Sequence, residues 1–171
     1  MKNIIYLVYP GLGKTYSAKI DKRILEVQYN NFYNLNRRKL GEHFPEDKKM
    51  NLNLEVEVDP EFPMNILNYI NNGLKENKFP VMALKPQNID FCIKYKYDFA
   101  FLLPSKERQA KLKEDYIKRG NTTEYIERNM KMLENIEKEI SKYNKKIYYL
   151  NNDEYLIDFI NKMVTLWKLR I

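Results

Sequence analysis

The sequence predicts an α/β protein of three layers, in which helices cover both faces of a five-stranded parallel sheet. Apolar runs of strand length alternate with helical patterns along the chain, as in sheets built from strand–helix–strand units. The first run, from Ile4 to Val8, is apolar throughout, as a strand buried on both faces requires. It leads directly into a glycine-containing turn that ends in Gly13-Lys14-Thr15. A ligand site is therefore expected at the carboxyl ends of the strands.

Five apolar runs supply the predicted strands, because each is bounded by turn-forming or charged residues. Pro104 ends the fourth of them, since proline cannot donate to a central strand ladder. In chain order the predicted strands cover residues 3–8, 23–28, 79–84, 98–103 and 145–150. Residues 52–58, LNLEVEV, alternate strictly between apolar and charged or polar side chains and predict an additional edge strand.

Helices are predicted between these strands, mostly from apolar side chains at helical spacing. Pro63 begins one of them, where its fixed φ is already helical. Gly120-Asn121 separates the two charged helices that follow the fourth strand. The predicted helices cover residues 14–21, 64–76, 88–96, 106–119, 122–143 and 153–169.

Length and composition restrict the class of protein. The chain has 171 residues, of which 44% are apolar, so residues 1–171 are expected to form one globular domain. The only cysteine, Cys92, excludes a disulfide framework and is typical of a reducing compartment. No apolar run reaches the roughly 20 residues that span a bilayer, so we expect no membrane contact and a cytoplasmic location.

The net charge of +7 favours a polyanionic partner, either a phosphate-bearing ligand or nucleic acid. Asn, Lys, Ile and Tyr are abundant along the whole chain, and an AT-rich genome would produce the same bias. The charge therefore indicates a class of partner without selecting one.

The turn after the first strand, YPGLGKT, has the composition of a phosphate-binding loop. Glycines let backbone N–H groups turn toward an anion, the next helix directs its N-terminus there, and a lysine reaches the β- and γ-phosphates. Thr15 supplies the hydroxyl expected on Mg²⁺. We therefore expect a P-loop NTPase fold whose triphosphate contacts Pro10, Gly11, Leu12, Gly13, Lys14, Thr15 and Tyr16.

One position departs from the usual motif. Val8 stands where a phosphate loop has its first glycine. Pro10 partly replaces the stiffening role of that glycine, because its ring fixes φ. The alternative interpretation is an ordinary strand–turn–helix connection with a capping threonine and no ligand.

Four segments in a fixed order resemble a known family. They are YPGLGKT, EVQYNNF, DPEFPMNILNYI and LLPSKERQAKLKEDYIKRGN, and together they span most of residues 4–160. Their order and spacing are similar to small phage-encoded P-loop proteins described as nucleotide-kinase-like (adenylate-kinase-like) and ATP-binding. The resemblance implies ATP and Mg²⁺ as ligands, a helical lid at about residues 104–143 and an acceptor region at about 29–78.

The carboxylates of this family are missing at two strand ends. Gln28 stands at the tip of the second strand where the family has an acid, and residues 84–87, Leu-Lys-Pro-Gln, contain none either. Such acids help to hold Mg²⁺ or accept the proton of the acceptor. Glu26 is the remaining candidate for a catalytic carboxylate, or else a strand residue paired with a lysine.

Three arginines fall in the segment that corresponds to the lid. By the resemblance, Arg119 would stabilise the charge on the transferred phosphoryl group, while Arg108 and Arg128 would bind the triphosphate. Gly120 would be the hinge. Asp115 stands where a second arginine is expected. The alternative is that these arginines belong to a solvated helix face.

Two functions are compatible with these observations. The first, which we favour, is an ATP-dependent nucleotide-kinase-like phosphotransferase that moves the γ-phosphoryl group to a nucleotide or nucleoside. Its catalytic residues would be Lys14, Arg119 and Glu26, with Mg²⁺ on Thr15. The second is a catalytically degenerate nucleotide-binding protein that acts as a phage or host interaction partner.

A nucleic-acid hydroxyl kinase would share the first mechanism and differ only in its acceptor. Tyr29, Phe32 and Tyr33 follow the second strand, where aromatic rings would stack on the bases of a nucleic acid. Packing in the core is the alternative role for these three rings.

Overall fold

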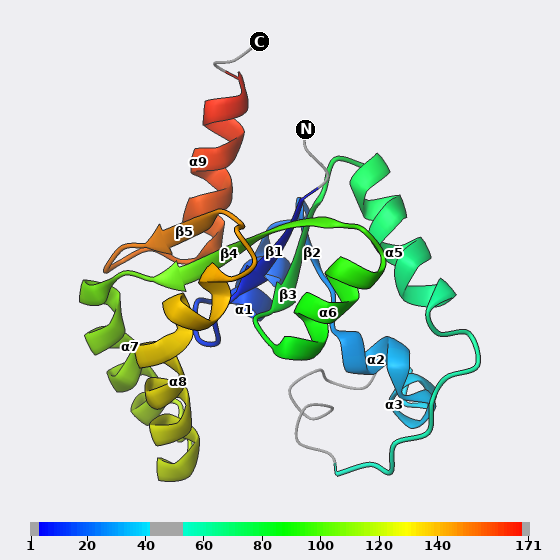
Figure 1. The fold of residues 1–171 in the computed structure, drawn as a ribbon, viewed down its shortest axis with the longest axis horizontal. Coiled ribbons are helices and arrows are strands. Elements are labelled where there is room, and N and C mark those ends of the chain that lie inside the picture. Colours follow the sequence, from blue (N-terminus) through cyan, green and yellow to red (C-terminus); the bar gives the residue numbers. More distant parts are fainter. Residues whose placement is uncertain (1–3, 42–52, 169–171) are drawn as a thin grey trace.

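A five-stranded parallel sheet forms the centre of the computed structural model, which describes residues 4–41 and 53–168 (Figure 1). The strand order is β2-β3-β1-β4-β5, and every neighbouring pair is parallel. The strands are β1 (Ile4–Val8), β2 (Ile24–Glu26), β3 (Phe79–Ala83), β4 (Asp98–Pro104) and β5 (Ile147–Leu150). The predicted α/β fold with five parallel strands is therefore confirmed.

Helices pack on both faces of this sheet. Figure 1 shows α6 in front of the strands and α1 behind them, and α1 also packs on α9. The helices are α1 (Lys14–Ile20), α2 (Tyr29–Tyr33), α3 (Leu35–Lys39), α5 (Met64–Lys75), α6 (Pro86–Lys94), α7 (Lys106–Lys118), α8 (Thr123–Ser141) and α9 (Leu156–Lys168). None of those in the described ranges is long and apolar enough to cross a bilayer.

The core is built around β1, which is the middle strand. Ile5 and Leu7 are fully buried, and the Tyr6 ring on the opposite face lies 5.3 Å from the ring of Phe159 in α9. A side chain of this kind contributes about 1.5–3 kcal/mol when it is buried completely. The apolar run of the first strand is thus explained by burial on both faces.

The register of the sheet brings the ends of neighbouring strands together. Val8, the last residue of β1, pairs with Ala83 of β3 and with Leu102 of β4. Beyond β3, the Leu84 amide donates to the Val8 carbonyl at 2.9 Å. The segments that follow β1 and β3 therefore begin side by side at the same edge.

The predicted edge strand at 52–58 is wrong for the part that is described, and Leu52 lies outside the described residues. Residues 53–57 have no regular secondary structure, and Val58 forms only an isolated antiparallel bridge with Asn34. Val56 is 66% exposed and Val58 52% exposed, so the alternating pattern does not bury an apolar face. Alternation predicts a strand only where a sheet is available to cover one side.

The short helices α2 and α3 follow β2, and neither was predicted from the sequence. The Asn34 side chain between them accepts a hydrogen bond from the Asn36 amide at 3.0 Å, which caps the start of α3. The segment with Val58 runs beside α3, where the Leu35 amide donates to the Glu57 carbonyl at 2.7 Å. These elements build a wall beyond the end of β2.

Candidate functional site

The loop after β1 requires glycine at two positions. Gly11 has φ +88° and Gly13 has φ +79°, both in the left-handed region that favours glycine. A Cβ atom on Gly11 would lie 2.5 Å from Cδ1 of Leu112, and one on Gly13 would lie 2.9 Å from Cδ1 of Tyr155. Backbone conformation and close packing therefore both exclude larger residues.

Protein contacts hold the carbonyl side of this loop. The Tyr116 hydroxyl donates to the Pro10 carbonyl at 2.7 Å, and the Leu156 amide donates to the Leu12 carbonyl at 3.1 Å. Among the described residues, none accepts a hydrogen bond from the backbone amides of residues 11–15. The loop thus presents N–H groups that remain available to an anion.

Lys14 and Thr15 converge on one carboxylate. The Lys14 ammonium group forms an ion pair with Oε1 of Glu26, and the Thr15 hydroxyl donates to the same oxygen at 2.8 Å. The Glu26 side chain is 13% exposed at the end of β2. Glu26 is therefore a strand residue paired with a lysine, as one interpretation predicted. Because that lysine is Lys14 of the loop, the carboxylate also lies where a catalytic acid is expected.

The Thr15 hydroxyl and the Glu26 carboxylate are also possible ligands of a metal ion. A hydroxyl and a carboxylate oxygen are hard ligands of the kind Mg²⁺ takes, and Mg²⁺ usually needs only one or two protein groups besides phosphates and water. Within residues 4–41 and 53–168 there is no cluster of three or more acidic, histidine or cysteine side chains that would hold a metal alone. Thr15 and Glu26 therefore fit an ion that arrives with a nucleotide.

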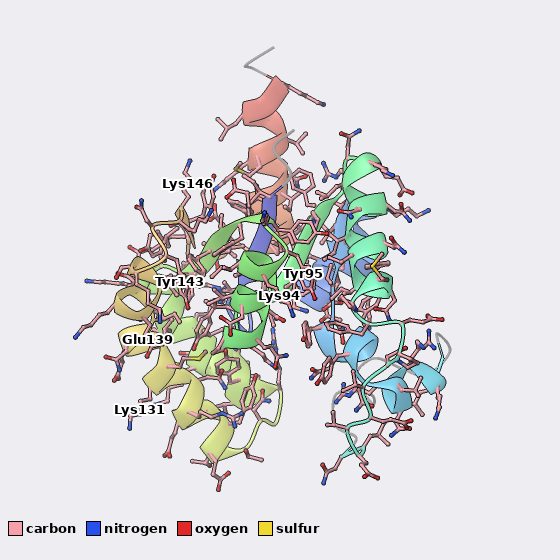
Figure 2. All side chains as sticks on the ribbon, turned by 45° about the vertical axis from the view of Figure 1, so that its right-hand side comes forward. Lys94, Tyr95, Lys131, Glu139, Tyr143 and Lys146 are labelled. Carbon is pink, nitrogen blue, oxygen red and sulfur yellow. The ribbon has the colours of Figure 1, made fainter. Side chains whose placement is uncertain are left out.

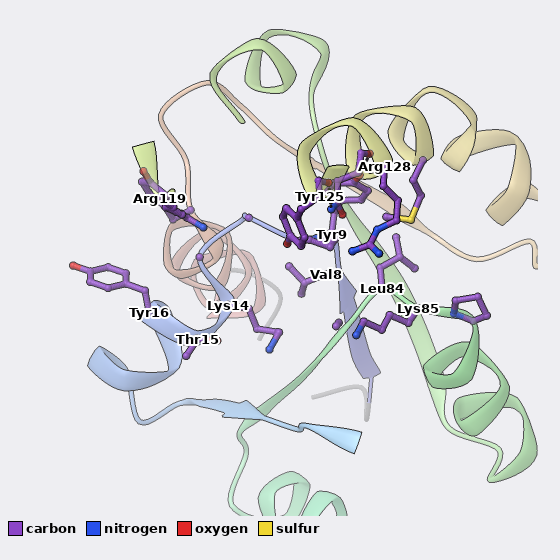
Figure 3. Close-up of a pocket in the computed structure, with 18 residues that line it drawn as sticks. Val8, Tyr9, Lys14, Thr15, Tyr16, Leu84, Lys85, Arg119, Tyr125 and Arg128 are labelled. Atoms are coloured by element: carbon purple, nitrogen blue, oxygen red, sulfur yellow. Dashed lines mark hydrogen bonds between the residues drawn. The ribbon is translucent and has the colours of Figure 1, made fainter. Parts of the chain in front are cut away.

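A cavity of about 1040 Å³ opens in front of the loop (Figure 3). Most of the predicted ligand-binding residues line it. They are Pro10, Gly11, Gly13, Lys14, Thr15, Tyr16, Arg119 and Arg128. The Leu12 side chain is fully buried beneath the loop and does not line the cavity.

Arg108 lies apart from the other predicted arginines. Its side chain is fully buried, with Nη1 3.1 Å from Oδ2 of Asp115 and the guanidinium group 5.0 Å from the centre of the Tyr155 ring. Asp115, which stands where an arginine was expected, therefore holds Arg108. The structure brings Arg119 and Arg128 to the cavity and keeps Arg108 behind it.

Sequence reasoning missed most of the wall that α8 contributes. Tyr125, Asn129 and Met132 line the cavity together with Arg128, which lies 5.6 Å over the Tyr125 ring. Tyr125 is three and Met132 four positions from Arg128, and Asn129 is four from Tyr125 and three from Met132, so these residues lie on one side of the helix. Helical spacing from Arg128 was the signal that would have found them.

Lys85 was also missed, because residues 84–87 were searched for a carboxylate. It lines the large cavity directly after β3. Burial lowers the pKa of the Lys85 ammonium group, and the positive charges of Lys14, Arg37 and Arg128 lower it further. A cation thus stands at the end of β3, where an acid was expected from the sequence resemblance.

A second cavity of about 550 Å³ has both Thr15 and Glu26 in its wall. Its walls come from α1, from β2 and from the segment between β2 and β3, and they include Phe32, whose ring lies 5.1 Å from that of Tyr69. Tyr29 and Tyr33 instead stack on each other, with ring centres 5.5 Å apart, and both pack against Phe62. Of the three aromatic residues after β2, Phe32 lines this second cavity, and Tyr29 lines a smaller one of about 130 Å³.

The positive charge is not confined to these cavities. Figure 2 shows Lys131 and Lys146 at the edge of the molecule, with side chains that extend outward. The net charge therefore combines a cationic cavity with lysines dispersed over the surface.

No protein-family model and no curated protein sequence matches the chain. Among solved structures, the chain is similar to dephospho-CoA kinase from Campylobacter jejuni, with 14% sequence identity and a TM-score of 0.40. The similarity covers 98% of this chain and 96% of that chain. The chain's own strand order and the glycine loop between β1 and α1 are those of a P-loop fold of the kinase type.

Proposed function

We propose that this protein is a P-loop phosphotransferase that moves the γ-phosphoryl group of ATP to a nucleotide or nucleoside. One observation carries the proposal. Thr15 lines both the large cavity and the second cavity, and the Glu26 carboxylate beside it faces the second one. A triphosphate on the loop and an acceptor in the second cavity would therefore meet at Thr15 and Glu26.

Each group at this meeting point has a role in the proposal. The amides of residues 11–15 and the Lys14 ammonium group bind the phosphates, and Arg119 balances charge on the phosphoryl group in transit. The acceptor oxygen forms a bond to the γ-phosphorus while the bond to the bridging oxygen breaks and ADP leaves; where the acceptor oxygen is a hydroxyl, Glu26 takes its proton. Mg²⁺, when bound beside Thr15, supplies further positive charge to the phosphates.

The proposal divides the chain into a donor side and an acceptor side. Residues 29–78 bind the acceptor, and Arg37 and Arg38 bring positive charge to the wall of the second cavity. Residues 104–143 cover the donor, as the resemblance to phage-encoded nucleotide-kinase-like proteins implies. Leu112 and Tyr116 of α7 pack against the loop, and the Tyr9 hydroxyl donates to the Asn129 carbonyl of α8, so both helices of this segment contact the β1 end that carries the loop.

A nucleotide-binding protein without transfer activity is the second candidate. Gln28 follows β2 and Lys85 follows β3, so neither strand end supplies a carboxylate beyond Glu26. Such a protein would retain the loop, Lys14 and Thr15 and would act through binding alone.

Calorimetric titration of ATP with Mg²⁺ tests the binding part of the proposal. The wild type should bind, and Lys14→Ala should weaken binding about 10- to 100-fold, since a hydrogen bond to a charged group contributes about 1.5–3 kcal/mol. Lys94→Ala is the matched control, because Lys94 is an exposed lysine at the far end of α6. Absence of binding by the folded wild type would refute both candidate functions.

Transfer is tested separately with Glu26→Gln. Wild-type protein and γ-labelled ATP are incubated with nucleoside monophosphates, nucleosides and an oligonucleotide with a free 5′-hydroxyl. Label should pass to a nucleotide or nucleoside, and Glu26→Gln should reduce the rate about 100-fold, within the range of general-base catalysis, while ATP still binds. ATP binding without transfer to any acceptor would favour the second candidate, and transfer to the oligonucleotide alone would identify a nucleic-acid kinase.

A further inference from the structure

We propose that Lys85 is a second phosphate-binding residue, which contacts the polyphosphate from the side opposite Lys14 and reduces the dependence of nucleotide binding on Mg²⁺. The proposal rests on the function proposed above, because it concerns the same cavity. It departs from the family pattern, in which an acid occupies the end of this strand.

The backbone fixes the position of Lys85. The Leu84 amide donates to the Val8 carbonyl at 2.9 Å, which continues the pairing of β3 with β1 up to the preceding residue. Lys85 itself is extended, with φ −145° and ψ 149°, and Pro86 enforces this conformation because it disfavours the helical region for the residue before it. The side chain therefore leaves the backbone beside the start of the phosphate loop.

Lys85 and Lys14 border the same two spaces. Both line the large cavity, and both line a smaller one of about 130 Å³ that lies between the ends of β2 and β3. Figure 3 shows the two lysines approaching from opposite sides, with Arg128 above them and the nitrogen ends directed into the cavity. A phosphate chain on the loop amides would pass between these cations.

Lys85 differs from Lys14 in its partners. Lys14 is paired with Glu26, whereas no carboxylate of the described residues lies within ion-pair distance of Lys85. The charged groups that act on Lys85 are Lys14, Arg37 and Arg128, all of them cations, and Arg37 likewise has no carboxylate partner in the described parts of the chain. Cations grouped in this way repel one another, and a bound polyanion removes that repulsion.

A lysine in place of an acid at the end of β3 changes how strongly phosphate binding depends on Mg²⁺. A carboxylate near the phosphates repels them unless a cation lies between the two, so an acidic strand end makes binding depend on Mg²⁺. An ammonium group attracts the phosphates directly. Lys85 thus supplies protein charge in a place where other sites need a metal ion.

Titrations of ATP and of inorganic tripolyphosphate, each with Mg²⁺ and with EDTA, test the proposal on wild type, Lys85→Ala, Lys85→Asp and the control Lys94→Ala. Removal of Mg²⁺ should weaken wild-type binding less than tenfold. Lys85→Ala should weaken binding in EDTA about 10- to 100-fold but binding with Mg²⁺ less than fivefold, because one charged hydrogen bond is lost and the metal compensates. Lys85→Asp should bind in EDTA more weakly still and recover on addition of Mg²⁺. Lys94→Ala should match the wild type.

Several outcomes would overturn the proposal. If Lys85→Ala changes both affinities less than twofold while Lys14→Ala abolishes binding, the loop is a triphosphate site but Lys85 is not part of it. A wild type that loses more than 100-fold in affinity without Mg²⁺ also contradicts the proposal. If the folded wild type binds neither ligand, the proposed function fails and this inference fails with it. Thermal unfolding of each variant shows whether a lost affinity reflects a lost fold.

Discussion

The ends of β1 and β3 lie side by side, yet they reach the cavity by different means. The segment after β1 is fixed by its own residues, with Gly11 and Gly13 in conformations that other residues rarely adopt. The segment after β3 is fixed by its neighbours, through the bond from the Leu84 amide to the Val8 carbonyl and through Pro86. The segment after β1 can be recognised in a sequence by its local motif. The segment after β3 has no such motif, and it reaches the cavity only because β3 pairs with β1.

The loop should be the less tolerant of the two, and Gly11→Ala is the strongest test. A positive φ costs an alanine about 1–2 kcal/mol, and overpacking against Leu112 and Tyr116 adds about 1–3 kcal/mol. We expect the free energy of unfolding to fall by about 2–5 kcal/mol in denaturant titration, and ATP binding to be lost.

Gly120→Ala is the control for Gly11→Ala. Its φ of +72° is similar, but a Cβ atom there would meet nothing within 4 Å. It should lose only the backbone contribution of about 1–2 kcal/mol. Equal losses in the two variants would show that close packing around the loop contributes nothing.

Val8→Gly restores the usual motif and should still be harmful. Val8 is 1% exposed in the middle strand, so the substitution removes a buried side chain and places glycine in a strand. The expected loss is about 2–3 kcal/mol in the free energy of unfolding. ATP affinity, measured by calorimetry, should change less than threefold.

Val56→Gly provides the comparison, because Val56 is 66% exposed and should lose less than about 0.5 kcal/mol. Tighter ATP binding by Val8→Gly, without loss of stability, would mean that the missing glycine is a defect of the site. The expected result instead makes Val8 a core residue of the strand that carries the loop.

Tyr116→Phe tests the tie between α7 and the loop with a smaller change. The Tyr116 hydroxyl donates to the Pro10 carbonyl at 2.7 Å in a buried position, so its removal leaves that carbonyl without this donor. We expect a loss of about 1–2 kcal/mol on thermal or chemical unfolding. Tyr149→Phe is the comparison, because the Tyr149 hydroxyl donates to Glu137 and Tyr149 is 45% exposed. Its free energy of unfolding should fall by less than about 0.5 kcal/mol. Similar losses in both variants would contradict a buried tie.

Local pattern predicted the sheet and the loop, whereas the resemblance predicted three arginines at the site, of which Arg119 and Arg128 line the cavity. The burial of Arg108 against Asp115 was not predicted, although the two residues are only seven positions apart. Arg108 is buried because α7 packs against Tyr155, a contact with a distant part of the chain. Lys85 was not predicted either, because an acid was expected at the end of β3 and because no local pattern shows which charges surround this lysine. Its neighbours Lys14, Arg37 and Arg128 come from three other segments of the chain.

Tyr16→Ala should have the smallest effect of these substitutions. Tyr16 lines the cavity, but its side chain is 62% exposed, and the described residues make no hydrogen bond with its hydroxyl. If position 16 contributes to phosphate binding through its backbone amide, the alanine variant keeps that contribution, and the Kd for ATP should change less than twofold. Thr15→Ala, which removes the hydroxyl beside Glu26, should weaken binding with Mg²⁺ more than Tyr16→Ala does. A tenfold loss of ATP affinity in Tyr16→Ala would instead indicate that the tyrosine ring contacts the nucleotide. The Tyr16 side chain would then contribute to ligand specificity, while the backbone amides of the loop bind the phosphates.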